Sequence, residues 1–196
     1  MRKINNPYTI PNLVTASRIA MIPLFVAAYF IPYRHANIIT TVIFVAAALT
    51  DWLDGYLARS LEQTSPFGAF LDPVADKLMV AAALILLLSD THNDYLLGRG
   101  IFSMAVLIII GREITISALR EWMAELGKRS KLKVSNAGKV KTGIQMTAIP
   151  FILYHDNLFG LPIFFMGEIL LYAAAAMTAW TMVAYLQIAW KDLTDF

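Results

Sequence analysis

The chain has 196 residues, of which 58% are hydrophobic and 15% are charged, and its formal net charge is +2. This composition is too apolar for a soluble globular domain, and the length is too great for a single membrane anchor. The absence of cysteine excludes disulfide bonds, thiolate metal sites and a cysteine nucleophile. Because a helix needs about 20 residues to cross the hydrocarbon core of a bilayer, the length accommodates five or six spans.

Six apolar segments predict an all-α integral membrane protein, with six transmembrane helices in one bundle and a single domain over residues 1–196. The fifth segment gives the weakest pattern, because its continuous apolar run is short and contains Pro150. Boundaries of such segments are accurate to a few residues. The expected spans cover roughly residues 12–32, 37–59, 67–89, 99–124, 138–155 and 160–190.

The positions of lysine and arginine predict the orientation of these helices. The loops near residues 33–36, 90–98 and 155–159 share one side, where only Arg34 and Arg99 lie nearby. We therefore expect both termini in the cytosol. Residues 1–10 are read as a cytosolic tail, with an amphipathic surface segment as the alternative. The predicted cytosolic side carries Arg2, Lys3, Arg59, Lys128, Arg129, Lys131, Lys133, Lys139, Lys141 and Lys191.

Asn12, Thr15 and Arg18 are spaced by three residues and form one helical face at the start of the first segment. We predict that they contact the nucleotide or a phosphate of a ligand. The alternative is a structural role in capping the helix and anchoring it at the membrane interface.

Four carboxylates lie in the second and third apolar segments, Asp51 with Asp54 and Asp72 with Asp76. An ionised Asp inside a bilayer costs at least a few kcal/mol unless it is compensated, so the default interpretation is a functional site. Spacings of three and four residues place each pair on one helical face. Because a short cytosolic turn joins the two segments, all four carboxylates are expected just inside the cytosolic surface. Oxygen ligands without His or Cys favour Mg²⁺, Mn²⁺ or Ca²⁺, and two such ions would clamp a diphosphate.

Small residues and one arginine accompany these carboxylates. Gly55 follows the second carboxylate directly, Ala58 lies one turn beyond it, and Gly68 lies one turn before the third. Small side chains on this face let a ligand approach the backbone closely, whereas helix–helix packing is the alternative explanation. Arg59 is either a phosphate contact or an interfacial anchor.

The whole pattern from Asp51 to Asp76 reads D-x-x-D-G-x-x-A-R-x8-G-x-x-x-D-x-x-x-D. At every fixed position it resembles the signature of the CDP-alcohol phosphatidyltransferase family. The resemblance implies a six-helix membrane enzyme in which an acceptor hydroxyl attacks the lipid-side phosphorus of a CDP-linked lipid and expels CMP. It also implies that Asp51, Asp54 and Asp72 bind Mg²⁺ or Mn²⁺, as two ions. By the same resemblance, Asp76 is a metal ligand, the general base, or both.

Later residues bear on the acceptor. Arg112 and Glu113 interrupt the fourth segment, and an Arg–Glu pair at that depth is either functional or a mutual structural neutralisation. Basic residues that enter the fifth segment need a partner there, although contact with the lipid surface is the alternative for most cations of this region. A basic pocket suits an acceptor that carries its own phosphate. The residues predicted to bind that phosphate are Arg112, Arg120, Lys139, Lys141 and Gln145.

Residues 11–18, 112–130 and 138–145 resemble the bacterial phosphatidylglycerophosphate synthases within this family. That resemblance implies CDP-diacylglycerol as donor, sn-glycerol 3-phosphate as acceptor, and a homodimer in the bacterial cytoplasmic (inner) membrane with its active site facing the cytosol. Membrane lipids are expected partners and nucleic acid is not. A sister enzyme that uses inositol phosphate, serine or phosphatidylglycerol is the nearest alternative. A membrane prenyltransferase and a divalent-cation transporter fit less well, because the former needs more spans and the latter leaves the small residues unexplained.

Overall fold

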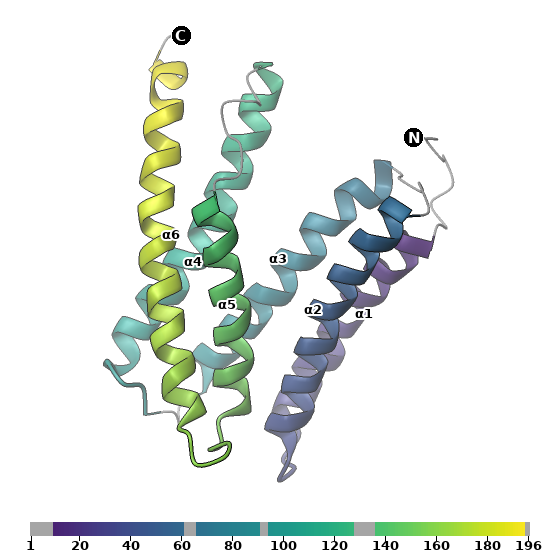
Figure 1. Cartoon of the computed structure of the whole chain (residues 1–196), viewed down its shortest axis with the longest axis vertical. Helices are drawn as coiled ribbons and strands as arrows, with labels where there is room; N and C mark the ends of the chain where they lie inside the picture. The colour runs from purple at the N-terminus through teal and green to yellow at the C-terminus, as the bar shows by residue number, and fades with distance from the viewer. Residues whose placement is uncertain (1–9, 61–65, 91–93, 128–135, 195–196) are drawn as a thin grey trace. The chain divides into compact units, whose positions relative to one another are not determined.

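The computed structural model describes residues 10–60, 66–90, 94–127 and 136–194. Within these ranges the chain is helical, with no β-strand beyond one isolated bridge between Leu158 and Leu161, which confirms the all-α prediction. Each helix overlaps one of the six expected segments (Figure 1). The helices are α1 (Ile10–Phe30), α2 (Ala36–Ser60), α3 (Pro66–Ser89), α4 (Gly98–Glu125), α5 (Asn136–Tyr154) and α6 (Ile163–Thr194).

The first of two compact units contains α1, α2, α3 and residues 153–156. α1 contacts both α2 and α3, and the latter two also touch. The rings of Phe25 and Phe44 meet at a centroid distance of 6.2 Å in its core. Buried alanines such as Ala47 and Ala75 leave room for close helix packing, as is common between membrane helices.

Polar contacts at the ends of these helices join segments that are far apart in the sequence. The Tyr29 hydroxyl donates to the Asp90 carboxylate at 3.4 Å, which links the end of α1 to the end of α3. The Asn37 side-chain amide donates to the Tyr154 carbonyl at 2.6 Å and to the Asp156 carboxylate at 2.7 Å. The residues that flank the three loops predicted to share one side are therefore in contact.

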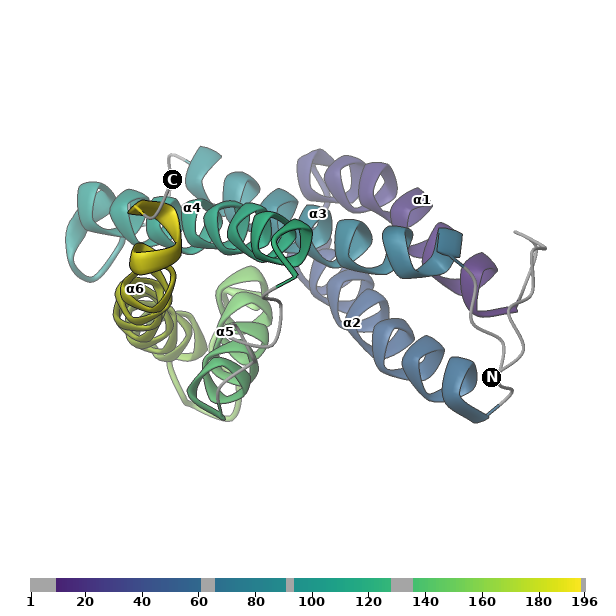
Figure 2. The same cartoon turned by 90° about the horizontal axis from the view of Figure 1, so that it is seen from above.

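The second unit contains α4, most of α5, and α6. α4 and α6 lie side by side in both views (Figures 1 and 2). Near the start of both helices, the buried carboxylate of Glu168 accepts hydrogen bonds from the Leu96 backbone N–H and the Tyr172 hydroxyl. The Tyr95 ring stacks on Phe102 at 4.1 Å. These contacts fasten the segment that precedes α4 to α6.

Helices α5 and α6 approach closely at Gly167. A methyl group added to this glycine would lie 2.7 Å from Ile152 Cγ1 and 2.8 Å from Phe151 Cβ, which is closer than side chains pack. α5 also continues through Pro150 as far as Tyr154, so the proline that weakened this prediction does not end the helix.

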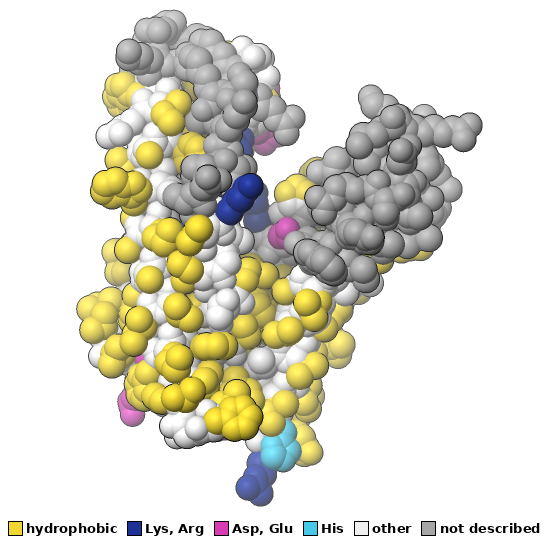
Figure 3. Space-filling model, in the orientation of Figure 1, with side chains coloured by type: hydrophobic (Ala, Val, Ile, Leu, Met, Phe, Trp, Pro, Cys, Tyr) yellow, Lys and Arg dark blue, Asp and Glu magenta, His cyan; other side chains and the backbone are white. Residues whose placement is uncertain are grey.

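Among the residues that the structure describes, three helices are long and apolar enough to span a membrane by length and composition, at Asn12–Phe30, Gly98–Glu125 and Ile163–Trp190. The described part of α2 contains a shorter apolar stretch, Ala36–Thr50. Hydrophobic side chains cover much of the described surface (Figure 3), as a membrane protein requires.

Candidate functional site

Both pairs of candidate metal ligands lie in helices, as their spacing requires. Asp51 and Asp54 belong to α2, Asp72 and Asp76 belong to α3, and these two helices are in contact. Of the four side chains, the structure describes only that of Asp76. No cluster of three potential metal ligands occurs among the described side chains, a search that leaves out the other three aspartates. The two-metal site therefore stays a prediction.

The small residues around these aspartates are described only in part. Gly68 is buried in α3, one turn before Asp72. The side chains of Ala58 and Arg59, and the surroundings of Gly55, lie outside the described part of the chain. Their predicted contact with a CDP-linked lipid stays untested.

An ion pair joins two residues that were predicted for different parts of the site. Arg18 of α1 is 1% exposed, and its Nη1 donates to Asp76 Oδ1 at 2.6 Å. The Asp76 side chain is 47% exposed, so its carboxylate stays accessible while the buried arginine holds it in one orientation. This ion pair brings a guanidinium of α1 and an accessible carboxylate of α3 into direct contact.

The other two residues of the α1 face are also buried. Thr15 and Asn12 lie about one and two turns before Arg18, and all three side chains are buried. Since α1 begins at Ile10, Asn12 is inside the helix and does not cap it. The capping alternative is therefore wrong, and three buried polar side chains continue along one face toward the ion pair.

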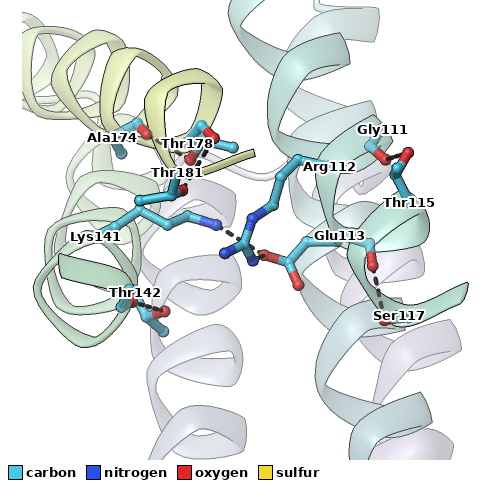
Figure 4. A network of polar contacts seen from close by, with 11 residues as sticks. Gly111, Arg112, Glu113, Thr115, Ser117, Lys141, Thr142, Ala174, Thr178 and Thr181 are labelled. Carbon is cyan, nitrogen blue, oxygen red and sulfur yellow. Dashed lines mark hydrogen bonds and ion pairs between the residues drawn. The ribbon is translucent and has the colours of Figure 1, made fainter. Parts of the chain in front are cut away.

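A cluster of alternating charges connects α4 with α5. Glu113 Oε1 accepts hydrogen bonds from Lys141 Nζ at 2.7 Å and from Arg112 Nη1 at 3.1 Å. Figure 4 shows the ammonium and the guanidinium both directed at this carboxylate. Lys141 is 1% exposed and Arg112 is 8% exposed. A single partly exposed carboxylate thus faces two buried cations.

Arg112 occupies a position that would ordinarily hold an apolar side chain. The buried residues of α4 repeat at three- and four-residue intervals, with Arg112 between Ile109 and Ile116 on the face that packs against α6. Its guanidinium lies 6.0 Å from the centre of the Tyr185 ring of α6. The guanidinium of Arg120 lies 5.8 Å from the same ring, so one aromatic residue connects the two arginines.

Several polar atoms of this region are buried with no hydrogen-bond partner among the described residues: Arg112 Nε, Arg120 Nε and Gln145 Oε1. Leaving such a group unsatisfied costs on the order of 1–3 kcal/mol, so a cluster of them indicates a place that a polar ligand completes. Two of these atoms are donors on cationic groups. Together with Lys141 they are groups of the kind that bind an anion.

The α5 candidates separate by exposure. Gly138, Lys141 and Gln145 are all buried, which confirms the helical face that their spacing predicts. Lys139 is exposed. The structure therefore brings together Arg112, Glu113 and Lys141, and through the Tyr185 ring it adds Arg120, whereas it leaves Lys139 on another face.

Sequence reasoning missed the contribution of α6. Thr178, Thr181 and Tyr185 are buried, and their spacing of three and four residues puts them on one helical face. The threonine hydroxyls donate to the carbonyls of Ala174 and Thr178 within the same helix. The signal in the sequence is the three- and four-residue spacing of these polar side chains within the last apolar segment. It is easily overlooked, because threonine and aromatic residues are common in membrane helices.

Comparison with known proteins identifies the family of this chain. The profile of the family described as CDP-alcohol phosphatidyltransferase matches residues 8–180. A CDP-diacylglycerol–glycerol-3-phosphate 3-phosphatidyltransferase from Haemophilus influenzae is 49% identical over 188 residues, which cover 96% of this chain and 97% of the relative. Proteins with the same description from Yersinia enterocolitica and Salmonella paratyphi A are 48% and 45% identical, over 95% and 96% of this chain and 97% and 98% of those relatives. The chain belongs to the CDP-alcohol phosphatidyltransferase family.

Proposed function

We propose that this chain transfers the phosphatidyl group of CDP-diacylglycerol to sn-glycerol 3-phosphate, giving phosphatidylglycerol phosphate and CMP. The relatives whose names state this donor and acceptor are 45–49% identical over nearly the whole chain. The structural observation that carries the choice of acceptor is the buried cluster of Arg112, Glu113 and Lys141, where two cations face one carboxylate. A phosphate-bearing acceptor supplies the negative charge that this cluster lacks.

In the proposed reaction, an acceptor hydroxyl attacks the phosphorus that carries the diacylglycerol. A new P–O bond forms to glycerol phosphate, the P–O bond to the CMP moiety breaks, and CMP leaves. The hydroxyl must lose its proton, and we assign its removal to Asp76. That carboxylate is accessible and is held by the buried Arg18 at 2.6 Å, as a positioned general base should be.

The donor part of the site is assigned to α1, α2 and α3. Asn12, Thr15 and Arg18 supply buried polar groups on α1, and Gly68 supplies a small residue on α3. The donor set of Asp51, Asp54, Asp72 and Asp76 contains only carboxylate oxygens, which suits Mg²⁺ or Mn²⁺. Two such ions, when bound, would neutralise the negative charge of the diphosphate.

The acceptor part is assigned to α4 and α5. Arg112, Arg120 and Lys141 provide cationic donors for the phosphate. Gln145 has a different task, because its buried Oε1 is an acceptor and a phosphate dianion offers no proton to it. We assign Gln145 to a glycerol hydroxyl. Lys139 is exposed, so we do not include it among the phosphate ligands.

We further propose six membrane spans, cytosolic termini, an active site open to the cytosol, and a homodimer in the bacterial inner membrane. The excess of lysine and arginine on one set of loops supports this orientation. Because the chain has no cysteine, single cysteines can be introduced in each loop and tested with a membrane-impermeant thiol reagent. Crosslinking in native membranes tests the dimer.

The direct test uses purified protein, CDP-diacylglycerol, Mg²⁺ and labelled glycerol 3-phosphate. We expect label to pass into a chloroform-soluble phospholipid with stoichiometric release of CMP. Parallel reactions contain inositol phosphate, serine or phosphatidylglycerol as acceptor. Transfer to one of these, with none to glycerol 3-phosphate, would assign the chain to a sister activity.

A further inference from the structure

Tyr185 of α6 contacts the two arginines of the proposed acceptor site at once. Its side chain is buried, and the guanidinium carbons of Arg112 and Arg120 lie 6.0 Å and 5.8 Å from the centre of its ring. Both distances are within the range in which the negative face of an aromatic ring attracts a cation. The two arginines are eight residues apart on α4, a rise of about 12 Å along the helix axis. Side chains that begin two turns apart therefore converge on one ring.

The ring itself is fixed by packing. Tyr185 belongs to a cluster of buried side chains from α4 and α6 that includes Ile116, Leu119, Met123 and Ala189. Neighbours of this kind allow an aromatic side chain little freedom to move. An aromatic ring held in this way restricts the guanidiniums that rest against it.

The arginines still have unused hydrogen-bonding capacity. Nε of Arg112 and Nε of Arg120 are buried and have no hydrogen-bond partner within the described part of the chain. Tyr185 attracts the cations without consuming any N–H group, because the contact is made through the ring face. A carboxylate at the same position would neutralise the arginines and occupy their donors. The ring thus holds two positive charges ready for an anion that arrives later.

We propose that Tyr185 is a positioning residue for the acceptor: its ring holds Arg112 and Arg120 in the orientation that receives the phosphate of glycerol 3-phosphate. This inference rests on the proposed function. Tyr185 does not touch the reacting atoms, so its removal weakens acceptor binding and leaves donor binding and turnover at saturating acceptor close to wild type. The aromatic ring carries this effect.

Three variants distinguish the effect of the aromatic ring from the effect of the side-chain volume. Tyr185→Met keeps an apolar side chain in the cluster and removes the ring. Tyr185→Phe keeps the ring and removes the hydroxyl. Met123→Ala removes volume from the same cluster and leaves the aromatic residue itself unchanged, so it serves as the packing control.

We expect Tyr185→Met to raise the KM for glycerol 3-phosphate about tenfold, the scale of two cation–π contacts at the weaker end of their range. The Tyr185→Phe and Met123→Ala variants should stay within about twofold of wild type in this KM, a change of about 0.4 kcal/mol. The KM for CDP-diacylglycerol should not change in any variant. Equal effects of Met and Phe at position 185, or equal effects on both substrates, would overturn the proposal.

A second measurement does not depend on turnover. Thermal unfolding in detergent with and without glycerol 3-phosphate reports ligand binding as an increase in Tm. We expect the increase to persist in Tyr185→Phe and to shrink in Tyr185→Met. If Tyr185→Met does not fold, a pentafluorophenyl ring in place of the Phe ring of the Tyr185→Phe variant preserves shape and reverses the charge of the ring face. This ring should reduce the increase in Tm, and an unchanged increase would refute the inference.

The two measurements also distinguish the inference from the function on which it rests. If wild-type protein transfers no label to lipid from glycerol 3-phosphate, the proposed function fails whatever the Tyr185 variants do. If wild-type protein is active and the variants show no acceptor-specific change, only the role of Tyr185 fails. If wild-type protein shows no increase in Tm with glycerol 3-phosphate, the proposed acceptor site is absent and the inference fails with it.

Discussion

Replacement of Lys141 by methionine removes one charge from the proposed acceptor site while it keeps most of the side-chain volume. Lys141 is almost fully buried, and its Nζ lies 2.7 Å from Glu113 Oε1. A charge-assisted hydrogen bond from Lys141 to the acceptor phosphate would contribute about 1.5–3 kcal/mol. Because the methionine cannot make this bond, we expect the KM for glycerol 3-phosphate to rise by about 10- to 100-fold. Glu113 keeps Arg112 as a partner at 3.1 Å, and the protein should therefore remain folded.

Steady-state kinetics with each substrate varied in turn measures this effect. Lys139→Met is the matched control, because it removes the same charge two residues earlier on α5 from an exposed position. We expect the control to change the acceptor KM less than about threefold, as is usual for an exposed charge worth under about 1 kcal/mol. An equal effect of both variants, or an effect of Lys141→Met confined to CDP-diacylglycerol, would refute the assignment.

Four further predictions concern the charged cluster, the proposed general base, the metal ions and the packing of α5 on α6. Glu113→Gln should lower the Tm, because two buried cations lose their carboxylate, and added glycerol 3-phosphate should raise the Tm more than it does in wild type. Asp76→Asn should reduce kcat by about 100-fold or more with the protein still folded by circular dichroism; wild-type turnover would make this residue structural. EDTA should abolish activity and added Mg²⁺ or Mn²⁺ should restore it, whereas full activity in EDTA would exclude the metal site. Gly167→Ala should lower the stability by about 1–3 kcal/mol through its clash with α5, while Gly143→Ala, which has open space around it, should not.

Much of the fold follows from local properties of the chain. Apolar runs with polar breaks predict all six helices, since each helix must satisfy its backbone hydrogen bonds internally in a bilayer. Helical spacing also predicts the common face of Gly138, Lys141 and Gln145. Such periodicity depends only on residues of one helix. It does not report which other helix that face meets.

The contacts between side chains of different helices could not be predicted from the sequence. Arg18 and Asp76 were assigned to different ligands, and the structure shows them in one ion pair across 58 residues of sequence. Tyr185 was overlooked because an aromatic residue in an apolar helix normally indicates packing or an interface. Its contact with Arg112 and Arg120 depends on the register between α4 and α6, which single-helix patterns do not encode.

The central claim is that a buried cationic cluster selects a phosphate-bearing acceptor for a CDP-lipid transferase. The transfer assay with labelled glycerol 3-phosphate tests it most directly, with wild-type protein and the Lys141→Met variant side by side. We predict labelled phospholipid and equimolar CMP from wild type, and the same products from the variant only at much higher acceptor concentration. Absence of labelled phospholipid from wild-type protein, with transfer to an acceptor that lacks a phosphate, would contradict the claim.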